Sequence, residues 1–156
     1  MKRSLVLLAL AISLGLTPNA RAQIEGSEAI RLTRSAVQAE RQAIIAANLQ
    51  LDETERAVFW PLYQEYRNDL DVAINSRVDF LNQYFASYET LTDKEAVALL
   101  EQHLAWEQEV LKIRTKHAKK MSKALSGRTV AKFFQIDNKM DIIIDYEMAG
   151  EIPLIK

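Results

Sequence analysis

Hydrophobic residues recur at helical spacing over most of the chain, and the two longest runs lie between residues 51 and 125. The first run covers residues 53–88, with apolar side chains every three or four positions. The second covers residues 93–125 and keeps a seven-residue spacing along one face: Val97, Leu104, Leu111, Ala118 and Leu125. Leu100 and Met121 join that face. The pattern predicts two long helices that form an antiparallel hairpin.

Both runs open with the same helix-start signature. A leucine precedes a short oxygen-bearing residue, Asp52 or Thr92, and a glutamate follows three residues later, at Glu55 or Glu95. In such a capping box the first side chain accepts a free backbone N–H, and the glutamate reaches back to another. We therefore expect a helix to begin directly after each of the two caps.

Two flanking helices complete the prediction. A narrow, interrupted apolar stripe predicts a helix over residues 27–48, and a last helix is expected over residues 129–149, after a glycine C-cap at Gly127 and before Gly150. Pro61 lies inside the first long helix and predicts a kink there. The aromatic residues around it are expected to be core rather than a binding patch: Phe59, Trp60, Tyr63 and Tyr66. We predict an elongated all-α fold of four helices.

The second long helix carries another apolar line, roughly 100° around from the first. Its members are Leu99, Trp106, Val110 and Ile113. A helix with two apolar faces needs two neighbours. One should be the first long helix, and the other could be the last helix, a second subunit or a client polypeptide. We expect this second line to be partly exposed and to form a client or partner surface.

The first 22 residues have the pattern of a secretory leader. Lys2 and Arg3 precede an apolar run over residues 5–16, and a small-residue cleavage site ends at Ala22. That run is shorter than the ~20 residues that a spanning helix needs, so no stable membrane insertion is expected after cleavage. The expected mature chain, residues 23–156, is a single domain in the periplasm. The chain contains no cysteine, which excludes disulfides and thiolate catalysis.

Removal of the leader makes the chain more acidic. The full chain has 20 Lys and Arg against 21 Asp and Glu, and the leader contains three of the cations, so 17 remain. Export and an acidic balance disfavour nucleic acid as a partner. Along the second long helix, acids lie in the first half and cations in the second, which suits the helix dipole and an antiparallel neighbour. A basic surface for an anionic client is the alternative.

Candidate chemistry is sparse. No catalytic constellation, phosphate-binding loop or cofactor motif is present, so we predict a protein that is not an enzyme. His103 and Glu107 have an i, i+4 spacing, but two ligands make a weak metal site. Asp137, Asp141 and Asp145 recur every four residues and repel one another. Either cations of the second long helix or a divalent metal should offset them, and no specific metal site is predicted.

The chain resembles the Spy/CpxP group of small periplasmic stress proteins in its two capping boxes, its leader and its lack of cysteine. The boxes are Leu51-Asp52-Glu53-Thr54-Glu55 and Leu91-Thr92-Asp93-Lys94-Glu95. That group is marked by Leu-Thr-x-x-Gln repeats at helix starts, and here glutamate replaces the glutamine. The resemblance covers residues 51–125. It implies a cradle formed by a homodimer and ATP-independent chaperone or envelope-stress activity on unfolded or envelope proteins. Some relatives are linked to metals, so a metal-binding or metal-resistance role is the alternative.

Overall fold

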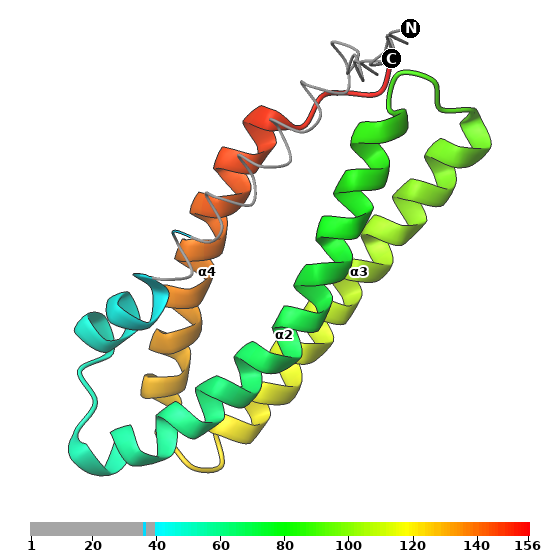
Figure 1. Ribbon diagram of the computed structural model, residues 1–156. Coiled ribbons are helices and arrows are strands. Elements are labelled where there is room, and N and C mark those ends of the chain that lie inside the picture. The colour runs from blue at the N-terminus through cyan, green and yellow to red at the C-terminus, as the bar shows by residue number, and fades with distance from the viewer. Residues whose placement is uncertain (1–35, 37–39) are drawn as a thin grey trace, which may run out of the picture.

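The fold is built from helices that run alongside one another, as the computed structural model in Figure 1 shows. The structure describes residue 36 and residues 40–156. A helical segment covers residues 40–49, and three helices follow: α2 (Glu53–Ser87), α3 (Asp93–Met121) and α4 (Gly127–Glu151). No strand occurs within these described ranges, so the all-α prediction is confirmed. The elongated cradle stays a prediction.

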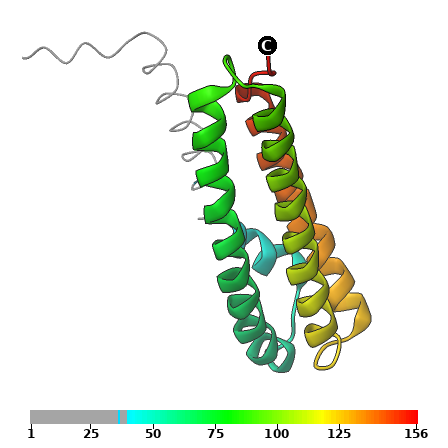
Figure 2. The same cartoon turned by 90° about the vertical axis from the view of Figure 1, so that its right-hand side faces the viewer.

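α2 and α3 form the expected antiparallel hairpin (Figures 1 and 2). The second capping box is complete: Thr92 accepts the backbone N–H of Glu95 at 3.3 Å, and the Glu95 carboxylate accepts that of Thr92 at 2.9 Å. Only half of the first box forms. Asp52 accepts the N–H of Glu55 at 2.8 Å, but the Glu55 carboxylate accepts a hydrogen bond from the Thr129 hydroxyl of α4 at 3.0 Å. The helix start is as predicted, and a tertiary contact takes the place of the second capping bond.

Three helix ends differ from expectation. α3 stops at Met121 rather than Leu125, because the chain tightens into a turn over residues 122–124, where Met121 accepts the N–H of Ala124 at 3.0 Å. Gly127 is not a C-cap but the first residue of α4, whose start Ser126 caps by accepting the N–H of Thr129 at 3.1 Å. α4 also runs past Gly150 to Glu151. It ends there because a proline two residues later disfavours helix in the residue before it.

The main core lies where α2, α3, α4 and the segment 40–49 meet. Phe59 and Tyr66 of α2 and Phe133 of α4 are fully buried, with the rings of Phe59 and Phe133 centred 5.2 Å apart. The aromatic residues around Pro61 are therefore core, as predicted, and the axis of α2 changes direction in this first third of the helix (Figure 1). The rings of Phe59, Tyr63 and Tyr66 all contact Phe133 of α4.

The C-terminal tail folds back against the hairpin. The Tyr84 hydroxyl donates to the carbonyl of Pro153 at 2.5 Å, and Lys156 forms an ion pair with Glu89 at 2.6 Å. The C-terminus consequently lies beside the turn between α2 and α3 (Figure 1).

The predicted leader, residues 1–22, and most of the predicted helix over residues 27–48 lie outside the described residues. Within residues 40–156, no helix combines the length and apolar character needed to cross a bilayer. The helical segment 40–49 agrees with the end of the predicted first helix.

Candidate functional site

One face of α3 presents four exposed apolar side chains. Val97, Leu100, Leu104 and Leu111 are 55%, 55%, 45% and 65% exposed. They belong to the seven-residue line recognised in the sequence, so they lie along one side of the helix. Large contiguous apolar patches are uncommon on the surfaces of monomeric proteins. We refer to these four residues as the α3 stripe.

The other apolar line of α3 faces α2. Val110 and Ile113 are only 9% and 7% exposed and belong to the core, while Leu99 and Trp106 are half-buried. The expectation that this line is exposed is wrong for Val110 and Ile113. The sequence revealed two apolar faces but not which of them α2 covers. The first face is exposed at Val97, Leu100, Leu104 and Leu111, but its member Met121 is fully buried.

Trp106 explains why this face is the buried one. Its indole N–H donates to the backbone carbonyl of Ala73 on α2 at 2.8 Å, which the small, buried side chain of Ala73 permits. The guanidinium of Arg77 lies 4.6 Å from the centre of the indole ring, a cation–π contact. Trp106 therefore binds α3 to α2, and its indole is not a free surface for a client.

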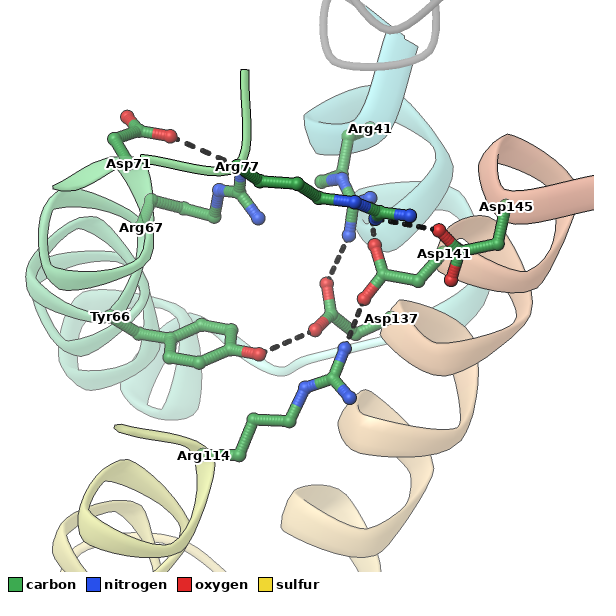
Figure 3. Close-up of polar contacts among 9 residues, drawn as sticks. All are labelled: Arg41, Tyr66, Arg67, Asp71, Arg77, Arg114, Asp137, Asp141 and Asp145. Atoms are coloured by element: carbon green, nitrogen blue, oxygen red, sulfur yellow. Dashed lines mark hydrogen bonds and ion pairs between the residues drawn. The ribbon is translucent and has the colours of Figure 1, made fainter. Parts of the chain in front are cut away.

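A cluster of buried ion pairs joins the segment 40–49 to α4 (Figure 3). Arg41 and Asp137 are 2% and 1% exposed, and Arg41 donates to both Asp137 and Asp141. The Tyr66 hydroxyl donates to Asp137 at 2.7 Å, and Arg114 donates to Asp141. One polar network thus connects α2, α3, α4 and the segment 40–49. Its hydrogen bonds offset part of the free-energy cost of removing these charged groups from water.

The electrostatics of this network keep its hydrogen-bonding roles fixed. Burial lowers the pKa of Arg41, but Asp141 and Asp137 more than offset that effect, so its pKa lies above the ordinary value. Burial, with the nearby negative charge of Asp137, raises the pKa of Tyr66. Arg41 therefore remains a cation, and the Tyr66 hydroxyl remains a donor, across the physiological pH range.

Arginines offset the aspartate ladder of α4. Arg41 and Arg114 pair with Asp141, and Arg77 of α2 pairs with Asp145 at 2.8 Å. Cations were expected from α3, and this is confirmed for Arg114 alone, because Arg41 comes from the segment 40–49 and Arg77 from α2. In the part of the chain that the structure describes, no three His, Cys, Asp or Glu side chains are placed to hold a metal ion.

The two histidines occupy separate environments. His103 Nε2 lies 3.6 Å from Glu107, so the i, i+4 pair does form on α3, and its ring stacks 6.0 Å from Trp106. His117 is buried and contacts Asp69 at 2.7 Å through Nε2. Neither site brings a third metal donor from the described residues.

A cavity of about 310 Å³ lies beside the ion-pair cluster, between α4 and the hairpin. Four arginines line it together with apolar residues of α2, α3 and α4: Arg41, Arg67, Arg77 and Arg114. Sequence reasoning missed this site, because these arginines come from three separate elements. The only signal was the aspartate ladder, whose repulsion required cations nearby.

Comparisons with known proteins add no relative: no protein-family model, no curated protein and no solved structure matches this chain. The resemblance to the Spy/CpxP group rests on the capping boxes and the leader pattern, and it stays a prediction.

Proposed function

We propose that the protein is a non-enzymatic periplasmic binding protein that holds unfolded segments of other proteins on the α3 stripe, without ATP. The observation that carries this proposal is the α3 stripe itself, a line of four exposed aliphatic side chains on one side of the helix. The leader pattern supports export to a compartment that supplies no ATP.

The dimensions of the α3 stripe suit a short extended segment. Residues 97–111 span about 21 Å along a helix, at 1.5 Å per residue. An extended chain of about six residues covers that length. Apolar side chains of that segment would be removed from water when they pack against the stripe, and full burial of one such side chain contributes roughly 1.5–3 kcal/mol.

Charged residues border the α3 stripe and keep the interaction weak. Glu101, Glu107 and Lys112 are exposed on α3 among its apolar members. A client that binds loses chain entropy and must desolvate these groups, so only part of the apolar gain appears as affinity. Weak and reversible binding is what a holding protein without an energy source requires.

A homodimer is part of the proposal. The outer face of α4 exposes Ile142, Ile143 and Tyr146, a second apolar surface that another copy would cover while leaving the α3 stripe open. Light scattering on the mature protein should give the mass of two chains, and Tyr146→Glu should give the mass of one. A wild-type monomer at tens of micromolar would contradict this part of the proposal.

The experiment that tests the function is suppression of client aggregation. Wild-type protein should slow the aggregation of a thermally unfolding client without ATP, and Leu100→Glu and Leu104→Glu should each reduce that protection. Val72→Glu is the matched control, because Val72 is an exposed aliphatic residue on α2, outside the α3 stripe. All three variants should keep wild-type helicity and melting temperature. Full protection by both stripe variants would refute the proposal.

A further inference from the structure

We propose that the cavity between α4 and the hairpin binds a small amphipathic carboxylate, one negatively charged head on an apolar chain of medium length. This ligand differs from the polypeptide segments proposed to bind the α3 stripe. The cavity and the stripe are also different surfaces, although Leu111 belongs to both. The argument rests on unused hydrogen-bond donors in the cavity wall.

Arg67 of α2 supplies most of those donors. The residue is 8% exposed, yet within the described ranges its ion pair is a 3.4 Å contact with Asp71, a largely exposed residue. A guanidinium carries five N–H donors, and the contact with Asp71 uses only part of them. The nitrogens of Arg67 are not among the fully buried polar atoms that lack a partner, so its remaining donors are open to water. Arg67 is therefore a buried cation with capacity to bind an anion.

Arg41 and Arg77 lie close to that group. Figure 3 shows the guanidinium groups of Arg41, Arg67 and Arg77 gathered on one side of the ion-pair cluster, and all three line the cavity. The buried Nε of Arg41 has no hydrogen-bond partner, although both ends of its guanidinium are bonded to aspartates. Guanidinium forks match the planar geometry of a carboxylate, which accepts two parallel N–H bonds.

The acids around the cavity restrict the charge of the ligand. The cavity wall also contains Glu107, Asp141 and Asp145, and Asp137 forms an ion pair with Arg41. A dianion would be repelled by these carboxylates, whereas a single negative charge can use the free N–H groups of Arg67. The site therefore favours a monocarboxylate over a phosphate monoester.

The rest of the cavity is apolar. Leu70, Val110, Ile144 and Met148 form this part of the wall. At about 310 Å³ the cavity is at the small end of the ~300–1,000 Å³ range of small-molecule sites, so it suits one medium-length chain rather than a whole phospholipid. The head would lie against the arginines and the chain along these four residues.

Titration calorimetry on the mature protein tests the proposal with decanoate, kept below its micelle concentration. We expect saturable binding with one site per chain, and at least tenfold weaker binding of decanol, which lacks the charge, and of acetate, which lacks the chain. Arg67→Met should weaken decanoate binding at least tenfold. Its stability should hold, because the residue left behind, Asp71, is largely solvated.

Two further variants separate the site from general effects. Arg128→Met removes an exposed arginine at the start of α4 and should leave the affinity unchanged. Arg67→Lys keeps the charge without the fork and should bind more weakly than wild type but more tightly than Arg67→Met. No decanoate binding up to millimolar, equal binding of decanol, or wild-type affinity in Arg67→Met would each overturn the proposal.

Discussion

Asp137→Asn tests whether the buried ion-pair cluster stabilises the packing of α4 against the rest of the bundle. Asp137 accepts hydrogen bonds from Arg41 and from the Tyr66 hydroxyl, and it is almost fully buried. The amide keeps the shape and removes the charge. Breaking a buried ion pair by removing one partner costs about 3–5 kcal/mol, because the other charge is left uncompensated. Arg41 retains Asp141, so we expect a loss near the lower end, about 3 kcal/mol.

Urea unfolding followed by circular dichroism measures this loss. With a slope of about 2 kcal/mol per molar urea, a loss of about 3 kcal/mol lowers the unfolding midpoint by about 1.5 M. Tyr66→Phe should cost about 1.5–3 kcal/mol, since it removes a hydrogen bond to a charged acceptor. The loss of stability in the double variant should be smaller than the sum of the losses in the two single variants, because both substitutions act through Asp137.

Asp145→Asn is the control on the same helix. Asp145 is 54% exposed and pairs with Arg77, and exposed ion pairs contribute about 0–1 kcal/mol. If Asp137→Asn cost no more than Asp145→Asn, the buried cluster would contribute little to stability, and the reasoning from burial would be refuted.

Trp106→Phe keeps an aromatic ring but loses the N–H donated to Ala73, so thermal unfolding should show a loss of about 1 kcal/mol, and an unchanged melting temperature would contradict the structural role of Trp106. Thr92→Ala removes the capping oxygen of α3 and should lower the free energy of unfolding, measured with urea, by about 1 kcal/mol. An unchanged free energy of unfolding would show that the cap does not stabilise the helix. The hydrogen bonds from the side chain and backbone of Thr92 hold the pKa of Glu95 below its ordinary value of 4.5. This stabilisation is present above that value and is lost as the pH falls through the lower folded value, so the melting temperature should fall in acid; a rise between pH 5 and pH 3 would be inconsistent.

Helix starts could be predicted from the sequence because their causes are local. The caps at Asp52 and Thr92 act on backbone groups three residues away, so a short window of sequence contains all of the physics. The Glu55 side chain could not be placed in that way. Its partner, Thr129, is 74 residues away and reaches it only through the packing of α4 on α2.

The orientation of α3 was beyond the sequence pattern. Both apolar lines of α3 were recognised, yet the assignment of the exposed one was wrong for Val110 and Ile113. The choice depends on the neighbour: Ala73 offers a small side chain and a carbonyl to Trp106. Such a contact between residues 33 positions apart leaves no trace in the periodicity of either helix.

The cavity was invisible for a similar reason. The aspartate ladder of α4 implied compensating cations on α3, and only Arg114 of the three arginines observed comes from that helix. Which cations would serve depended on three helices meeting, since Arg41, Arg77 and Arg114 occupy unrelated positions in the sequence. Sequence spacing reports the need for charge on one helix, but not the element that supplies it.

Photo-crosslinking from the α3 stripe tests the central claim most directly. A benzoylphenylalanine placed at residue 104 lies within the stripe, and one at residue 72 lies on an exposed position of α2. When a client unfolds in the presence of each variant, we predict adducts with the client from position 104 and few or none from position 72. Equal yields from both positions, or adducts from position 104 only to a second copy of this chain, would contradict the account.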